Sequence, residues 1–519
     1  MNKGQYQLLL GLLIIISIGV SVGILYYWTF KPETISNQTT TTTGTTTAST
    51  TTPTISTTTP TISAITSTTT YSTTETTTSS IPPTANQLVS MTGTVAYVIG
   101  LNGSIVYARN GDTGQIDYSG TDATIVIQNA LIKTSSNGGG TVVLRVGRYY
   151  MSGVLSLPTN VALVGELKGP FDPSSNPATT TVGPTFLITS NSTEFITVTG
   201  YNTALENIIF VYPNQVSPSA STPISYPFTV KLSRGQAGFK ARNLLFVNSY
   251  QAIDLEGGRA LLEDLWIGAF RTGIFIDHSA DVIYISNVIM SVFWDTTNLL
   301  LHGQPIDNWV QNNGYGLVIE RADGVYINNM FIFYKYAGIY LRDSYDTSLS
   351  IRNSWGSAVN VVMDAVQYGL LVQSTQNGPG WTFSNLQIIS VVNNPKSAVY
   401  YQTGGTQVPK VRILGGSFSG AWAAPVNTNA VPGSYLYISD IQWYNPVGAI
   451  TAPSIPASGT PAMNTQPFKV QVFVNGGTVS NIAINGANTG MNSGTFLLMP
   501  TDTITLFYSS SPSWAWFGL

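Results

Sequence analysis

The 519-residue sequence predicts an all-β chain. The expected architecture is a right-handed parallel β-helix with a short N-terminal capping helix, a small C-terminal β-sandwich and an N-terminal transmembrane helix. Three observations predict it. A short pattern of polar and apolar residues recurs through the middle of the chain, an uncharged apolar run lies near its start, and a stretch rich in Pro, Ala and Ser precedes its last segment.

The recurring pattern has two elements. In the first, an Asn or Asp precedes apolar residues in alternation, and its positions are Asn207, Asn243, Asp264, Asn287, Asn329, Asn385 and Asp440. In the second, a small residue precedes two apolar positions that flank any residue, and it begins at Ala252, Gly273, Gly316, Gly338, Gly369 and Ala398. Short β segments that repeat every 20 to 30 residues or so, without helices between them, indicate a solenoid. A leucine-rich repeat is the alternative, but its fixed leucine spacing is missing.

In such a solenoid each coil buries alternate side chains, and coils stack about 4.8 Å apart. The recurring Asn fits a turn in which its amide bonds the amide of the neighbouring coil.

The N-terminal segment, residues 1–30, predicts a membrane anchor or a signal segment. Residues 8–28 are almost entirely apolar, long enough to span a bilayer. Tyr26, Tyr27 and Trp28 are typical of an interfacial aromatic belt. Lys3 favours a cytoplasmic N-terminus, so the rest of the chain should face outside. Lys3-Gly4-Gln5 also resembles the processing site of archaeal pilin-type signal peptides, which leaves cleavage open.

Residues 31–87 are dominated by Thr and predict a disordered stalk, because so few apolar groups cannot offset the ordering entropy. N-glycosylation acceptor patterns begin at Asn37, Asn102 and Asn191, which favours an exported glycoprotein. The net charge of −3 argues against nucleic-acid binding. Cysteine is absent, which excludes disulfides and thiolate metal sites.

The folded region is predicted to begin at residue 88 and the β-helix to extend to residue 445. Two short strands should flank the Asn102-Gly103 turn. A capped helix should follow from Thr121-Asp122 to about Lys133. Residues 446–467 predict a linker, and residues 468–519 a small β-sandwich.

Several motifs carry a family resemblance. They are Asn110-Gly111-Asp112-Thr113-Gly114, Ser119-Gly120-Thr121-Asp122-Ala123, Gly138-Gly139-Gly140-Thr141-Val142 and Leu157-Pro158-Thr159-Asn160-Val161. Together they resemble the first segment of the pectate-lyase-like superfamily, in its rhamnogalacturonase/epimerase-like and phage tailspike branch. The resemblance covers roughly residues 108–166, and the coils to about 445 by pattern only. It implies a helix-capped β-helix, and a homotrimer as one form of assembly.

The resemblance does not carry an activity, because the superfamily contains hydrolases, lyases, epimerases and adhesins. The Asn-x-Asp, Asp-Asp and Gly-His-Gly motifs of its polygalacturonases are missing, as is the calcium-binding Asp cluster of pectate lyases. No catalytic residues can therefore be transferred. Asn475-Gly476-Gly477 and the segment from Pro512 to Trp516 resemble terminal domains of archaeal surface or viral fibre proteins.

Alignment of the second element places Glu256, Asp277, Glu320, Arg342, Gln373 and Gln402 in one column. Glu256 and Asp277 are expected about 4.8 Å apart. Asp277 and Glu320 are expected near 10 Å apart, if a coil containing His302 lies between them. Such separations resemble those of glycosidase carboxylate pairs, so Glu256, Asp277 and Glu320 are the candidate catalytic residues. Alternatively, the charged residues of the column only keep a turn in contact with water, and Arg342 neutralises Glu320 in a surface ion pair that contributes little to stability.

Candidate substrate-binding residues are concentrated in the segment 295–315, which interrupts the coil rhythm and is expected to form a loop. They are Asp295, His302, Asp307 and Trp309, together with Arg342 of the column. Aromatic rings in the coils could stack on sugar rings, although most are expected in the core. His278 and His302 are the only histidines, too few for a histidine metal site, and no metal or cofactor is predicted.

The favoured function is a membrane-anchored adhesin or receptor-binding protein on the surface of an archaeal cell or its virus, recognising glycan through the β-helix. The alternative is a hydrolase or lyase acting on uronic-acid or cell-surface polysaccharide. A third hypothesis is a purely structural envelope protein.

Overall fold

The computed structural model describes residues 95–169, 177, 179–190, 192–215, 221–291, 305–391, 395–429, 433–444 and 448–519. The predicted anchor at 8–28 and the predicted stalk lie outside the described residues, as do Asp295 and His302. Within the described ranges, no helix combines the length and apolar character needed to cross a membrane.

The folded region begins with an antiparallel hairpin and a capping helix. Strands β1 (Val95–Asn102) and β2 (Ile105–Asn110) flank the predicted turn, where Gly103 has a φ of +60°. Strand β3 (Ile116–Gly120) pairs with β2. Helix α2 (Ala123–Ser136) follows, capped by Asp122, and its Ile127, Ala130 and Leu131 are fully buried in the main core. The predicted hairpin and capping helix are confirmed.

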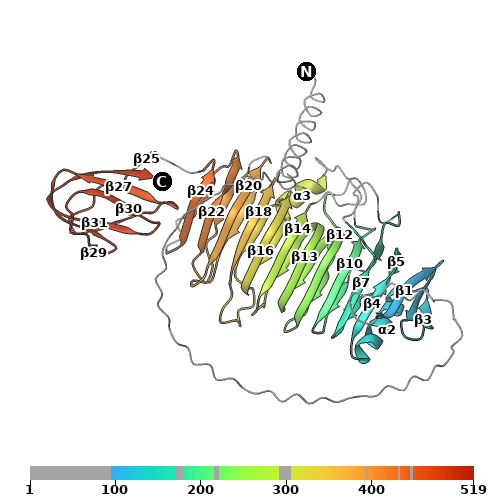
Figure 1. Cartoon of the computed structure of the whole chain (residues 1–519). Coiled ribbons are helices and arrows are strands. Elements are labelled where there is room, and N and C mark those ends of the chain that lie inside the picture. The colour runs from blue at the N-terminus through green and yellow to red at the C-terminus, as the bar shows by residue number, and fades with distance from the viewer. Residues whose placement is uncertain are drawn as a thin grey trace, which may run out of the picture. The chain divides into compact units, whose positions relative to one another are not determined.

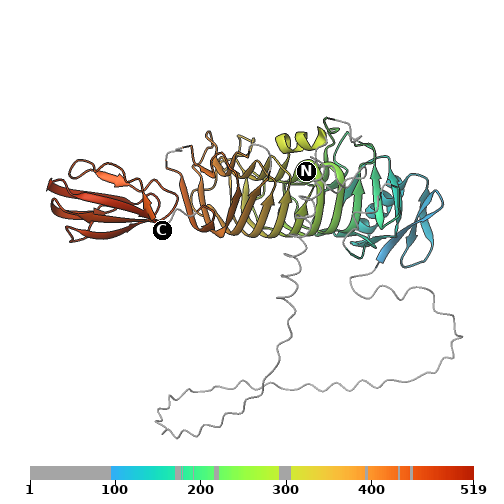
Figure 2. The same ribbon diagram turned by 90° about the horizontal axis from the view of Figure 1, so that it is seen from above.

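Three stacks of parallel strands form the body of the chain, and Figures 1 and 2 show successive strands side by side along it. We call these stacks the first, second and third faces. The first face contains β4 (Gly140–Leu144), β7 (Val161–Gly165) and the first parts of β10 (Thr203–Val211), β12 (Ala237–Leu255), β13 (Gly258–Ile276), β14 (Ile283–Met290), β16 (Ala322–Phe333), β18 (Ser354–Asp364), β20 (Trp381–Ser390), β22 (Lys410–Gly420) and β24 (Tyr435–Gln442).

The second face contains β5 (Gly147–Met151), β8 (Pro184–Ile188) and the following parts of β10, β12, β13, β14, β16, β18, β20, β22 and β24. The third face contains β6 (Leu155–Leu157), β9 (Ile196–Val198), β11 (Phe228–Leu232), the last parts of β12 and β13, β15 (Tyr315–Ile319), β17 (Ala337–Leu341), β19 (Tyr368–Val372), β21 (Ser397–Tyr401) and β23 (Val426–Asn427). This pairing is that of a parallel β-helix, which confirms the predicted β-rich solenoid.

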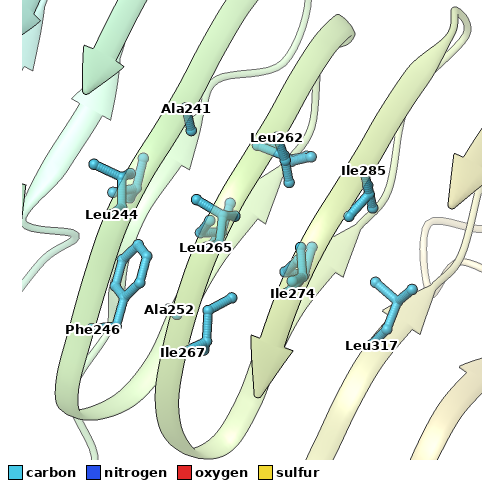
Figure 3. Close-up of a cluster of buried hydrophobic side chains, with 14 of the residues drawn as sticks. Ala241, Leu244, Phe246, Ala252, Leu262, Leu265, Ile267, Ile274, Ile285 and Leu317 are labelled. Atoms are coloured by element: carbon cyan, nitrogen blue, oxygen red, sulfur yellow. The ribbon is translucent and has the colours of Figure 1, made fainter. Parts of the chain in front are cut away.

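The core follows from the alternation of side chains along each strand. Inward residues of one coil lie beside their counterparts in the next, as Figure 3 shows for Leu244 beside Leu265 and Phe246 beside Ile267. Each of these side chains has an exposed fraction of 1% or less. Complete burial of such a side chain contributes roughly 1.5–3 kcal/mol, so the repeated alternation stabilises the solenoid.

The corner between the first and second faces carries the predicted amide ladder. The amide of Asn329 donates to Asn287 (Nδ2 to Oδ1, 3.2 Å), and the amide of Asn385 donates to Asn360 (2.9 Å). All ladder residues have positive φ, which bends the strand between the two faces. Asn360, which the sequence pattern did not identify, occupies an equivalent position in the ladder.

One prediction about the coils is wrong. No coil lies between Asp277 and Glu320, because β13 pairs directly with β15, with Ile276 opposite Ile319. The intervening segment contains helix α3 (Pro305–Asn313) and is an insertion in a single coil. The two carboxylate residues are therefore one coil apart, not two.

The C-terminal residues form two antiparallel four-stranded sheets around a core of their own. One sheet has the order β25 (Gly448–Ile450), β32 (Ser513–Gly518), β27 (Val470–Asn475), β30 (Gly494–Leu498). The other has the order β26 (Pro461–Met463), β31 (Thr503–Ser510), β28 (Thr478–Ile484), β29 (Ala487–Asn488). This arrangement is a small β-sandwich. Strands β25 and β26 come from the stretch 446–467, predicted as a linker, and pair with sandwich strands instead.

Candidate functional site

The predicted charged column forms where the strands of the third face end. Backbone amides of Glu256, Asp277, Glu320 and Arg342 donate to the strand of the preceding coil, at 2.8–3.0 Å. Gln373 and Gln402 continue this series. The alignment of these residues in one column is thus confirmed, with one coil spacing between neighbours.

Glu320 lies in a buried ion pair. Its side chain is 1% exposed, and Arg342 contacts it through Nε at 2.7 Å and Nη2 at 2.5 Å. The backbone amide of Tyr345 donates to it at 3.3 Å. Burial raises the pKa of Glu320 to about 7, with the nearby Asp277 adding to this effect and Arg342 opposing it. The pairing that the sequence left as an alternative therefore forms, but inside the protein.

Asp277 is bound within the turn that follows β13. Its carboxylate accepts hydrogen bonds from the backbone amides of His278 (2.8 Å) and Arg321 (3.1 Å) and from Ser344 Oγ (2.9 Å). Its side chain is buried. With three donors from three segments of the chain, this carboxylate connects the turn to the neighbouring loops, and it is poorly placed to reach a substrate.

Glu256 belongs to a charged cluster whose other three members, Lys231, Asp254 and Glu194, the sequence pattern did not identify as site residues. Lys231 Nζ lies 3.1 Å from Glu256 Oε1, 3.2 Å from Asp254 Oδ2 and 3.8 Å from Glu194 Oε1. Because both are held by one nitrogen, the Asp254 and Glu256 oxygens are at most 6.3 Å apart. Asp254 is 3% exposed, and burial raises its pKa to about 7, with Glu256 and Glu194 adding to this effect and Lys231 opposing it.

Aromatic side chains cover the outside of the third face next to these charges. The rings of Tyr315 and Tyr340 stack at 5.8 Å, and those of Phe228 and Phe275 lie 6.0 Å apart. The series continues with Tyr336, Tyr368 and Tyr400. We call this surface the outer third face. Burial raises the pKa of Tyr336 and of Tyr340 to about 12, so both hydroxyls remain protonated, and that of Tyr340 donates to Gln402 Oε1 at 2.7 Å.

Two arginines border a depression in the outer third face. The Arg271 guanidinium lies 4.8 Å from the Tyr315 ring centroid, and that of Arg342 lies 5.2 Å from the Tyr340 ring. The depression has a volume of about 260 Å³, and Phe228, Phe275, Tyr315, Tyr340 and Arg342 are among its lining residues. Aromatic rings, cations and adjacent carboxylates thus converge on one surface.

The two described residues of the predicted binding loop lie elsewhere. Ile306 and Val310 of α3 pack against Phe270 in a small buried cluster, with Trp309 half-buried beside it. Asp307 is 2% exposed. The loop prediction is wrong here, because these residues belong to a helix packed on the solenoid. Of the three predicted binding residues that the structure describes, Asp307, Trp309 and Arg342, only Arg342 lies on the outer third face.

No family model matches the sequence, and no curated protein is significantly similar to it. Solved structures with a similar course of the chain include the Dettilon tailspike protein gp208, at 10% identity and a TM-score of 0.41 over 76% of this chain and 91% of that one. The DFA-IIIase of Arthrobacter chlorophenolicus A6 has 9% identity and a TM-score of 0.37 over 59% and 84%. The A-module of the Azotobacter vinelandii mannuronan C-5 epimerase AlgE6 has 12% identity and a TM-score of 0.30 over 62% and 95%. At these scores the fold assignment depends on the strand pairing above, and the similarities decide nothing about function.

Proposed function

We propose that this chain is a glycan-recognising surface protein that binds saccharide on its outer third face. The supporting observation is the depression between Tyr315, Tyr340 and Arg342. Aromatic faces accept the C–H surfaces of sugar rings, guanidinium groups donate hydrogen bonds to sugar oxygens, and phenolic oxygens accept hydrogen bonds from sugar hydroxyls. A folded solenoid fixes these groups in place before a ligand arrives, which lowers the entropy cost of binding.

The predicted N-terminal anchor and stalk would place this binding surface outside the cell or on a virus particle. Residues 8–28 would anchor the chain in a membrane and residues 31–87 would carry the β-helix away from it, outside an archaeal cell or on its virus. Glycan would be the partner, and the assembly would be a homotrimer of the kind that the tailspike resemblance implies.

A second candidate function is cleavage of the bound glycan, and the pair Asp254 and Glu256 favours it. A retaining glycosidase places its two carboxyl groups about 5–5.5 Å apart, with one of them protonated as a general acid. The separation of at most 6.3 Å and the raised pKa of Asp254 are compatible with that arrangement. In this mechanism Asp254 would protonate the leaving glycosidic oxygen while the Glu256 carboxylate attacks the anomeric carbon, and water would then hydrolyse the resulting glycosyl-enzyme ester with Asp254 acting as the base. Asp277 has no part in it, because its carboxylate is occupied by three donors.

The test uses the full-length protein and a panel of acidic and neutral polysaccharides, following both retention and newly formed reducing or unsaturated ends. Binding without new ends supports recognition. New ends that disappear in Asp254→Asn would establish cleavage instead.

Tyr315→Ala should weaken binding at least tenfold, because it removes one ring from the depression. The matched control is Tyr284→Ala, which removes a 51% exposed tyrosine from the first face. Both variants are first compared with wild type in thermal unfolding. If Tyr315→Ala binds like wild type, the outer third face is not the binding surface.

A further inference from the structure

A second concave surface lies along the amide ladder, away from the outer third face. It is a groove of about 730 Å³ at the corner between the first and second faces. The ladder residues Asp264, Asn287, Asn329 and Asn360 form one side, and second-face side chains including Trp266 and Phe331 form the other. This volume is in the range of ligand sites, roughly 300–1,000 Å³.

The ladder leaves half of its hydrogen-bonding capacity unused. Asn287 donates to Asp264 (3.1 Å), Asn329 to Asn287 (3.2 Å) and Asn360 to Asn329 (3.2 Å). A side-chain amide has two N–H donors and a carbonyl with two lone pairs, so the ladder uses one of each. These residues are exposed. Each coil from Asn287 to Asn360 therefore presents one further donor and one further acceptor, repeated about every 4.8 Å along the groove.

The other side of the groove is apolar and in the same register. Trp266, Ile289, Phe331 and Val362 lie opposite one another in successive coils of the second face. The charged lining residues Lys168, Arg242 and Asp264 belong to the end nearest the N-terminal coils, and Arg242 is already paired with Glu206 at 2.8 Å. From Asn287 to Asn360 the lining is uncharged.

We propose that this amide groove binds an extended, uncharged glycan chain parallel to the solenoid axis, with one sugar residue per coil. Sugar hydroxyls both donate and accept, which matches the unused groups of each ladder amide, and sugar C–H surfaces match the apolar side. The residue repeat of an extended pyranose chain is close to the coil spacing. A peptide strand directs equivalent groups to one side only about every 6.8 Å, so it would lose register within two coils.

The test measures binding of cellohexaose, mannohexaose, xylohexaose and hexagalacturonate to the full-length protein by isothermal titration calorimetry. The main variant is the double substitution Asn287→Gly and Asn329→Gly. Glycine adopts positive φ without strain, so this change removes the amides while keeping the corner. The matched control is Asn385→Gly, because Asn385 belongs to the same ladder but does not line the groove. Ile289→Lys blocks the apolar side without touching the ladder, and it keeps the test decisive if the double variant folds poorly.

At least one neutral hexasaccharide should bind to wild type, with its Kd weakened tenfold or more by the double substitution and by Ile289→Lys. Asn385→Gly and Tyr315→Ala should leave that Kd within twofold, which separates this groove from the outer third face. The proposal is overturned if no neutral hexasaccharide binds, if only hexagalacturonate responds to the groove variants, or if the groove variants bind like wild type.

Discussion

Replacement of Asp254 by Asn should change how the stability of the protein depends on pH. Burial raises the pKa of Asp254 from 3.8 to about 7, so the folded state holds a proton that the unfolded state releases between these values. The contribution of Asp254 to the free energy of unfolding is therefore fully present below about pH 4, and it is lost as pH rises towards the folded pKa near 7. One pKa unit corresponds to 1.36 kcal/mol, so the loss amounts to about 4 kcal/mol. Asn has the shape of the protonated acid and does not titrate, so Asp254→Asn should avoid it.

The assay is urea unfolding of wild type and Asp254→Asn at several pH values between about 4 and 8. The free energy of unfolding of the variant, relative to wild type, should rise across this range by up to about 4 kcal/mol. Taking this difference cancels the titration of groups that the two proteins share. The matched control is Asp112→Asn in the exposed turn after β2, where a surface substitution changes stability little. A difference that is constant from pH 4 to 8, or that falls, would refute a protonated Asp254 in the folded protein.

Asp122→Ala removes the N-cap of α2, whose side chain accepts from the Thr124 amide at 2.9 Å, and should cost about 1 kcal/mol in urea unfolding; an unchanged midpoint would contradict the capping role. Gly316→Ala would place a Cβ 2.6 Å from the Gly338 carbonyl oxygen, so it should lower the free energy of unfolding in urea by about 1–3 kcal/mol. An unchanged free energy of unfolding would show that the neighbouring coils can move apart to accept the methyl group. Lys335 is buried, and loss of hydration lowers its pKa from 10.5 to about 7. The neutral amine therefore costs the folded protein nothing above pH 10.5, but the protein loses stability as pH falls from 10.5 to about 7, because the unfolded state then takes up a proton that the folded state does not. The free energy of unfolding of Lys335→Met should thus exceed that of wild type by on the order of 4 kcal/mol at pH 7, and the two should be equal near pH 11. A difference between them that does not depend on pH would count against a neutral buried Lys335.

Much of the solenoid could be predicted because its elements are short and repeat the same physical solution. Asn at the corner accepts positive φ and bonds its own kind one coil away, so the residue recurs wherever the bend recurs. The sequence pattern did not identify Asn360 because the residue before it, Val359, is apolar, whereas polar residues precede the other ladder positions. The sandwich strands and capping helix were also predictable, since their alternation and capping are local. The domain boundaries remain predictions.

The candidate site was harder to predict because it depends on what lies one coil away. The alternation in Ile253-Asp254-Leu255 already implies that Asp254 points outward, since its two neighbours point into the core. The sequence alone does not show that Lys231 stands opposite Asp254 in the preceding coil, 23 residues earlier. The same limitation explains the misplaced spacing of Asp277 and Glu320, because an insertion of coil-like length is not distinguishable from a coil before strand pairing is known. Chemistry on a solenoid is thus set by register between coils, and the amide groove and the Asp254 cluster are both consequences of that register.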